Sequence, residues 1–103
     1  MNLTDILKDV PLLSFQGEER LDIQGISYFS KDVQPGFLFA AVKGEKTDGY
    51  EFIKEALRNG ALAVLSDRPK PPKLNTNWIQ VFDTREALAL CSANFYEHPS
   101  RRM

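Results

Sequence analysis

Residues 35–52, PGFLFAAVKGEKTDGYEF, decide the fold of this 103-residue chain. An apolar segment, 37–42, is followed by a loop between Gly44 and Gly49 and then by the start of an amphipathic helix. An apolar run without alternation predicts a central strand, buried on both faces. A strand that leads through glycines into a helix directs free backbone N–H groups toward one place, which favours an anion such as a phosphate.

The loop does not complete the phosphate-binding pattern G-x-x-x-x-G-K-[ST]. Tyr50 and Glu51 stand where the lysine and the hydroxyl residue should follow the second glycine. The loop therefore lacks the groups that reach the β- and γ-phosphates and hold magnesium. On the loop alone, two glycines that only turn a strand into a helix are the better interpretation.

The neighbouring segments predict a βαβ unit. Residues 51–59 are amphipathic and 61–65 are apolar, so strand, helix and strand follow one another with a right-handed crossover. Asp48 is expected at the N-cap of this helix, and Gly60 is expected to end it with a positive φ.

The rest of the chain adds further elements on both sides of this unit. We expect a helix at 2–10, a strand at 22–28, a strand at 78–82 and a helix at 83–97, which Asp83 and Glu86 open as a capping box. Residues 14–20 are interpreted as a polar, turn-rich segment, and 67–77, with three prolines, as a surface loop. The order predicts a three-layer α/β domain, with a mixed sheet of about four or five strands flanked by helices.

Composition predicts one ordinary globular domain. The chain is 43% hydrophobic and 26% charged, with a net charge of −1, which gives no field to attract nucleic acid or an anionic membrane. No apolar run approaches the length of a membrane span, and the first residues do not resemble a signal peptide. We therefore expect a soluble, cytoplasmic domain without membrane insertion and without a nucleic-acid partner.

The residues indicate no catalytic group and no metal site. A single cysteine and a single histidine exclude a disulfide framework and a zinc site built from several such ligands. Cys91 lies on the apolar face of the last predicted helix, which favours an inert core thiol. His98 precedes a proline and is interpreted as a helix end. Taken alone, the residues predict an α/β domain with one plausible ligand loop.

Four blocks of sequence nevertheless follow one another in a specific order and spacing: 27–31 (SYFSK), 35–41 (PGFLFAA), 44–53 (GEKTDGYEFI) and 56–64 (ALRNGALAV). Together they resemble a known family, the Mur ligases, and in particular their N-terminal domain. These ATP-dependent enzymes build the stem peptide of peptidoglycan. The closing segments, 83–89 (DTREALA) and 95–100 (FYEHPS), are most similar to the MurE type. The MurF type, which adds D-alanyl-D-alanine, is one alternative, and a non-catalytic α/β interaction module is another.

The resemblance implies a substrate and the residues that bind it. The substrate is UDP-N-acetylmuramoyl-L-Ala-D-Glu, to which a MurE-type ligase adds meso-diaminopimelate or L-lysine as the third stem residue, and this domain holds its UDP end. By position, Tyr28 and Ser30 contact the uridine, and Glu45, Lys46 and Thr47 wrap the uracil. Under the resemblance, the glycine-bounded loop reads a base rather than a phosphate.

The sequence also departs from the family pattern. Phe29 stands where the family usually has aspartate, Phe37 where it has aspartate, serine or threonine, and Lys31 where arginine is commoner. The loss of the acid at 29 removes a hydrogen bond or ion pair that would order the loop, and the two phenylalanines could pack together instead.

The resemblance further implies that residues 1–103 are one excised domain. In the family the chain continues into a G-T-N-G-K-T loop of a central ATPase domain and then into a C-terminal domain, both expected to be absent here. ATP and Mg²⁺ would serve the full-length enzyme, which activates the substrate carboxylate as an acyl phosphate. The fragment is expected to hold no cofactor and no catalytic residue, to be inactive alone, and to act with the remaining ligase domains in cis.

Overall fold

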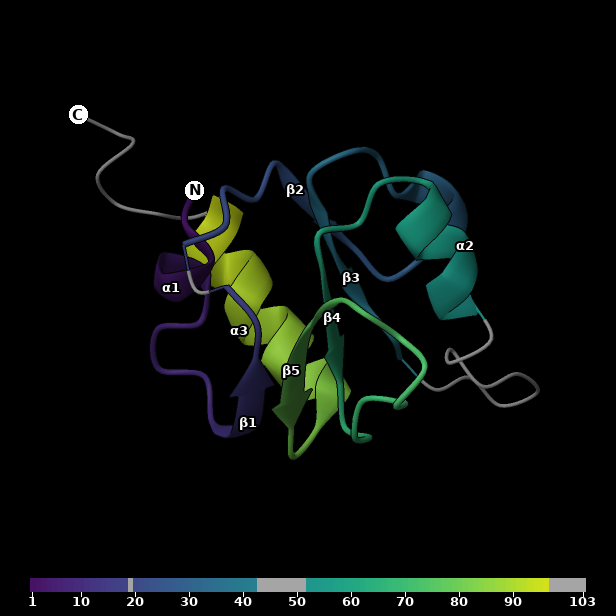
Figure 1. Cartoon of the computed structure of the whole chain (residues 1–103). Coiled ribbons are helices and arrows are strands. Elements are labelled where there is room, and N and C mark those ends of the chain that lie inside the picture. Colours follow the sequence, from purple (N-terminus) through teal and green to yellow (C-terminus); the bar gives the residue numbers. More distant parts are fainter. Residues whose placement is uncertain (19, 43–51, 97–103) are drawn as a thin grey trace.

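The computed structural model describes residues 1–18, 20–42 and 52–96 (Figure 1). Its helices are α1 (Leu3–Ile6), α2 (Ile53–Arg58), α3 (Thr84–Tyr96) and the short 3₁₀ helix η1 (Ser30–Asp32). Its strands are β1 (Leu12–Gln16), β2 (Gly25–Ser27), β3 (Phe37–Ala40), β4 (Ala63–Ser66) and β5 (Asn77–Val81).

In the described part of the chain, the strands form one five-stranded sheet in the order β1-β5-β4-β3-β2. The four strands from β2 to β5 run parallel, and β1 pairs antiparallel with β5. The sheet is therefore mixed, as predicted. β3, α2 and β4 form the predicted βαβ unit, and β3 lies inside the sheet between β2 and β4.

The alternation of side chains along β3 divides the core into two layers. Leu38 and Ala40 face one side of the sheet, where α1 and α3 cover them, and Phe39 faces the other side, where α2 covers it (Figure 1). The first layer also buries Leu3, Ile6, Leu65, Ile79 and Cys91. The second also buries Ile53, Ala56, Val64 and Trp78. The predicted three-layer arrangement is confirmed.

The interpretation of residues 14–20 as a polar turn segment was wrong over its first half, because 12–16 form the edge strand β1. Phe15 and Gln16 pair with Ile79 and Trp78 of β5, and the register shifts between Leu12 and Ser14. The shift interrupts the two-residue alternation by which a half-buried strand is recognised. A partner more than sixty residues away, rather than local pattern, therefore makes this strand.

Other boundaries move inward from their predicted positions. The opening helix ends at Ile6 rather than at residue 10, and Asp9 has a φ of +65°, which a right-handed helix cannot contain. The strand predicted at 22–28 is regular only as β2, over Gly25–Ser27. The cap of α3 is confirmed, since Asp83 Oδ1 accepts hydrogen bonds from the backbone N–H groups of Arg85 (3.0 Å) and Glu86 (3.2 Å).

Gly60 has the positive φ that the sequence predicts, +110°. It follows α2 and lies against the turn before β3, because its carbonyl accepts a hydrogen bond of 2.9 Å from the N–H of Gly36. A Cβ added at Gly60 would lie 2.5 Å from Pro35 Cα. Both the backbone angle and this close approach require glycine here.

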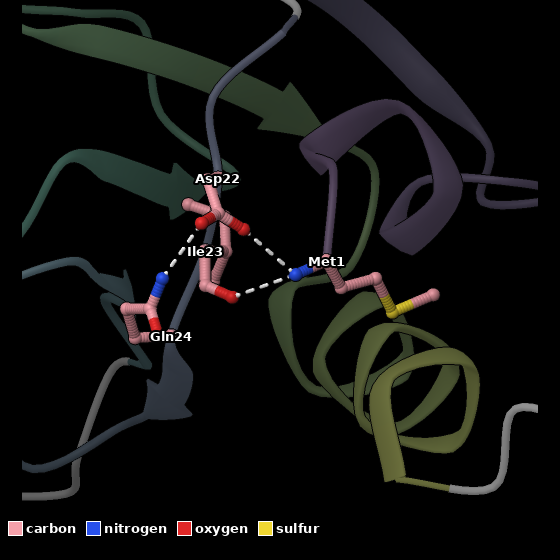
Figure 2. A network of polar contacts seen from close by, with 4 residues as sticks. All are labelled: Met1, Asp22, Ile23 and Gln24. Carbon is pink, nitrogen blue, oxygen red and sulfur yellow. Dashed lines mark hydrogen bonds and ion pairs between the residues drawn. The ribbon is translucent and has the colours of Figure 1, made fainter. Parts of the chain in front are cut away.

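A polar network joins the first residue to the segment that leads into β2 (Figure 2). The Met1 ammonium donates to Asp22 Oδ1 (2.9 Å) and to the carbonyl of Ile23 (3.3 Å), and Gln24 Nε2 donates to Asp22 Oδ2 (2.8 Å). The hydrogen bond from the ammonium, and then its charge, hold the pKa of Asp22 below the ordinary value of 3.8. The network anchors α1 beside the sheet.

The Asp22→Asn variant is expected to be slightly less stable than the wild-type chain near neutral pH. Because the pKa of Asp22 is lowered by folding, its contribution is present above the unfolded-state value and is lost as the pH falls through the folded-state value. The difference in unfolding free energy should therefore shrink as the pH falls below 3.8. Urea unfolding at several pH values measures it, with the exposed Asp67→Asn as control. A difference that is constant with pH would contradict the assignment.

The Gly60→Ala variant is expected to lose about 2 kcal/mol or more of unfolding free energy, because alanine is strained at this φ and its methyl group meets Pro35. Chemical denaturation should show a lower midpoint with an unchanged slope. Lys54→Ala, at an exposed position of α2, serves as control and should change the free energy by less than ~0.5 kcal/mol. Equal midpoints for Gly60→Ala and the wild-type chain would show that the strain argument is wrong.

Candidate functional site

The predicted binding residues belong to two segments that follow neighbouring parallel strands. β2 and β3 pair in parallel, with Ser27 opposite Phe39, so the chain leaves both strands at the same edge of the sheet. That edge, at the carboxyl ends of the strands, is where ligands bind in open α/β sheets. Glu45, Lys46 and Thr47 lie outside the described residues, as do the glycines of their loop. Tyr28 and Ser30 are the predicted site residues that the structure places.

Tyr28 lines an open hollow beside β2, which is the outermost strand on that side of the sheet. The side chain is 68% exposed. The hollow has a volume of about 510 Å³ and is lined by Ile26, Ser27, Tyr28, Phe29, Asp32 and Phe37. This volume is in the range of small-molecule sites. The lining combines aromatic faces with one carboxylate, which suits a planar group that carries hydrogen-bond donors.

The two phenylalanines that depart from the family pattern line this same hollow. Phe29 is 51% exposed, and Phe37 is half-buried at the start of β3. Phe37 lies across Gly25 of the neighbouring strand, where an added Cβ would be 2.6 Å from the Phe37 ring. The glycine in β2 therefore makes room for an aromatic ring.

The backbone beneath the exposed rings is held by local hydrogen bonds. Ser27 Oγ accepts from the N–H of Phe29 and donates to the carbonyl of Phe29, both at 3.0 Å. The N–H of Asp32 donates to the same carbonyl at 2.9 Å. Ser27 was not among the predicted site residues, although a serine two residues before a turn is a known signal for such bonds.

Ser30 occupies a different environment from Tyr28. It is 3% exposed, and its hydroxyl donates to Glu55 Oε1 of α2 at 2.5 Å. Its carbonyl accepts a bond of 3.0 Å from Asn59 Nδ2. The structure therefore turns Ser30 toward α2 and does not include it in the lining of the hollow. Sequence reasoning missed Glu55 and Asn59, since nothing local links them to a serine 25 and 29 residues earlier.

The site offers binding groups and no reactive group. Cys91 is a fully buried residue of α3, and burial raises the pKa of its thiol to about 12, so the prediction of an inert core thiol is confirmed. Within residues 1–18, 20–42 and 52–96, no three histidine, cysteine, aspartate or glutamate side chains are grouped so that they could hold a metal ion. Over the same residues, no helix has the length and apolarity needed to cross a bilayer.

Comparison with known proteins places most of the chain in one family. The family model described as "Mur ligase family, catalytic domain" matches residues 22–96. A UDP-N-acetylmuramoyl-L-alanyl-D-glutamate–2,6-diaminopimelate ligase of Solibacter usitatus is 43% identical over 105 residues. A ligase of the same name from Alkaliphilus metalliredigens is 36% identical over 103 residues. Each comparison covers all of this chain and 21% of the relative, so the chain spans about a fifth of these curated relatives.

Solved structures with the same fold include two MurF proteins. One crystal structure of MurF from Acinetobacter baumannii has a TM-score of 0.78 at 23% identity and covers 97% of this chain and 22% of that one, which shows the fold alone. The MurF ligase of Thermotoga maritima, in complex with ADP, has a TM-score of 0.58 at 37% identity over 69% of this chain and 16% of that one. These similarities agree with the three-layer α/β architecture described above.

Proposed function

The chain belongs to the Mur ligase family, and from that premise we propose that it is the UDP-substrate-binding, N-terminal domain of a MurE-type ligase. The observation that carries the proposal is the match of the whole chain to 2,6-diaminopimelate ligases at 36–43% identity. The longer protein would add meso-diaminopimelate or L-lysine to UDP-N-acetylmuramoyl-L-Ala-D-Glu in the cytoplasm, with ATP. Residues 1–103 would be its first domain.

The hollow at the β2 edge supports a role in holding the uridine. Tyr28 presents an exposed ring on a hydrogen-bonded turn, and a uracil base can stack on such a ring. Asp32 supplies carboxylate oxygens, which accept hydrogen bonds from ribose hydroxyls or from the uracil N–H. In this proposal Glu45, Lys46 and Thr47 complete the site from the loop after β3, as the family resemblance implies, and Ser30 belongs to the turn that carries Tyr28.

The chemistry of the ligase is assigned to the domains beyond this chain. ATP and Mg²⁺ do not fit the residues present, because Tyr50 and Glu51 replace the lysine and hydroxyl of a phosphate-binding loop. We therefore derive no step of acyl transfer from this domain. Its part is to bind the nucleotide end of the substrate and thereby present the distant carboxylate to the rest of the enzyme in cis.

A MurF-type ligase is the second candidate, favoured by the 37% identity to the Thermotoga maritima protein. That comparison covers 69% of this chain, whereas the diaminopimelate ligases align with all of it. An amide-ligase assay on the longer protein separates the two candidates. Consumption of diaminopimelate or lysine supports the MurE type, and consumption of D-alanyl-D-alanine with the UDP-tripeptide supports the MurF type.

Tyr28→Ala is expected to weaken UDP binding by roughly tenfold, because it removes a base-stacking ring. The Tyr28→Phe variant keeps the ring and should bind nearly as well as the wild-type chain. Since Tyr28 is 68% exposed, neither change should lower the melting temperature much. Titration of the ¹⁵N-labelled chain with UDP, followed by amide chemical shifts, measures both affinity and location.

Tyr96→Ala, which removes a 56% exposed tyrosine from the end of α3, is the matched control and should leave UDP affinity unchanged. The UDP-dependent shifts should include the amides of residues 26–32. A wild-type chain without UDP-dependent shifts would contradict the proposed function. Shifts confined to α1, β1 and α3 would contradict the proposed site.

A further inference from the structure

β1 leaves an apolar edge of the sheet open to solvent. In the part of the chain that the structure describes, β1 is the outermost strand beside β5, so no further strand pairs with its other side. Its sequence, LLSFQ, contains no charge and no proline, which are the usual protection of a free strand edge. Leu12 is 37% exposed and Leu13 is 49% exposed. An uncharged free edge with exposed leucines is a surface on which another segment can pack.

Two hollows border this edge on the side of the sheet that α1 and α3 cover. The larger, with a volume of about 230 Å³, is lined by Thr4, Leu7, Leu12 and Phe15. The smaller, of about 100 Å³, is lined by Pro11, Phe82, Asp83, Glu86 and Ala87. Phe82 is 67% exposed and follows Val81, which pairs with Leu12. The edge and the two hollows therefore share one apolar surface, which we call the β1 flank: Pro11, Leu12, Leu13, Phe15 and Phe82.

The carboxyl end of α3 lies beside the β1 flank. Asn94, two residues before the end of α3, donates from Nδ2 to the carbonyls of Ile6 (2.8 Å) and Lys8 (2.9 Å). This end of α3 therefore lies against α1 and the residues that follow it (Figure 1). Leu7, between the two accepting residues, lines the larger hollow. A segment that continues from α3 thus starts next to this hollow.

We propose that the β1 flank is the docking surface for the part of the longer protein that follows residue 103. The proposal rests on the proposed function, in which residues 1–103 are the first domain of a ligase. This chain covers 21% of the curated relatives, so most of such a protein follows the described residues. A partner that is joined covalently to α3 has a high effective concentration, so a modest apolar surface is sufficient to hold it.

The β1 flank is also clear of the hollow that contains Tyr28. β1 and β2 are the two outermost strands in the order β1-β5-β4-β3-β2. Four strand spacings of about 4.8 Å place them roughly 19 Å apart. Docking on the β1 flank would therefore hold this domain against the rest of the enzyme and leave the hollow beside β2 open to the nucleotide.

Thiol labelling at residue 13 tests the docking. The single cysteine, Cys91, is fully buried and its thiol has a pKa of about 12, so it does not compete with an introduced Leu13→Cys. The variant is treated with a maleimide in residues 1–103 and in the longer protein, and mass spectrometry follows the peptide that contains residue 13. Labelling should be roughly tenfold slower in the longer protein, since a thiol that is covered for about nine-tenths of the time reacts at about a tenth of its free rate.

A second substitution in the β1 flank tests the same surface within the longer protein alone. Phe82→Lys places a charge in the apolar contact and should raise the labelling rate of Leu13→Cys about threefold or more. Phe29→Lys, at a 51% exposed phenylalanine away from the β1 flank, is the matched control and should leave that rate unchanged. Phe82→Lys should leave UDP affinity unchanged, which a general loss of structure would not allow.

Lys54→Cys, at an exposed position of α2 on the other side of the sheet, should be labelled at the same rate in both proteins. Equal rates at residue 13 in the two proteins would overturn the proposal. Slowing at residue 54 as large as at residue 13 would also overturn it, because the covered surface would then not be the β1 flank. Labelling of residues 1–103 that slows as their concentration rises would identify a second copy as the occupant and overturn it too.

Failure of the proposed function has a different signature. A chain without UDP-dependent amide shifts, whose residue 13 is nevertheless protected in the longer protein, would lose the nucleotide assignment and keep the docking surface. A chain that binds UDP, but whose residue 13 is labelled equally fast in both proteins, would keep the nucleotide assignment and lose the docking surface.

Discussion

Burial of β3 on both faces is the constraint on which the rest of the structure depends. Leu38 and Ala40 are covered by α1 and α3, and Phe39 is covered by α2. A strand with two apolar faces cannot be accommodated without a layer on each side. Because β2 and β4 pair with β3 in parallel, the position of β3 also sets where the chain leaves β2. The candidate site is therefore placed by the core.

The candidate site combines exposed aromatic side chains with a backbone that is held by local hydrogen bonds. Tyr28 and Phe29 are among the most exposed large hydrophobic side chains of the described residues, yet the N–H and the carbonyl of Phe29 are hydrogen-bonded to Ser27 and Asp32. Ordering such a turn before a ligand arrives lowers the entropy lost on binding. Under the proposed function, this arrangement would suit capture of a substrate whose reaction takes place in other domains.

Much of the fold could be predicted because its strongest signals are local. The apolar run of β3, the helix before Gly60 and the Asp83 cap of α3 each depend on residues close in sequence, and each is confirmed. β1 could not be predicted in the same way, because its register shift hides the alternation and its partner is remote.

The residues of the candidate site show the same difference between local signals and long-range contacts. Tyr28 is exposed in the structure, and its contact with the uridine stays a prediction. The bond from Ser30 to Glu55 joins residues 25 positions apart, on a turn and a helix that pack only once the domain is folded. The uridine contact that the family resemblance gives to Ser30 stays a prediction, and the burial of Ser30 against Glu55 depends on a tertiary contact that no local motif encodes.

The dependence of the N-terminal segment on distant partners has a consequence for synthesis on the ribosome. β1 pairs with β5, and Asn94 Nδ2 of α3 donates to the carbonyls of Ile6 (2.8 Å) and Lys8 (2.9 Å), residues 88 and 86 positions earlier. β1 and the end of α1 therefore lack these native partners until β5 and α3 have been translated, although Met1 meets Asp22 and Ile23 much earlier. The parallel core can assemble first, and the amino-terminal segment closes over it last.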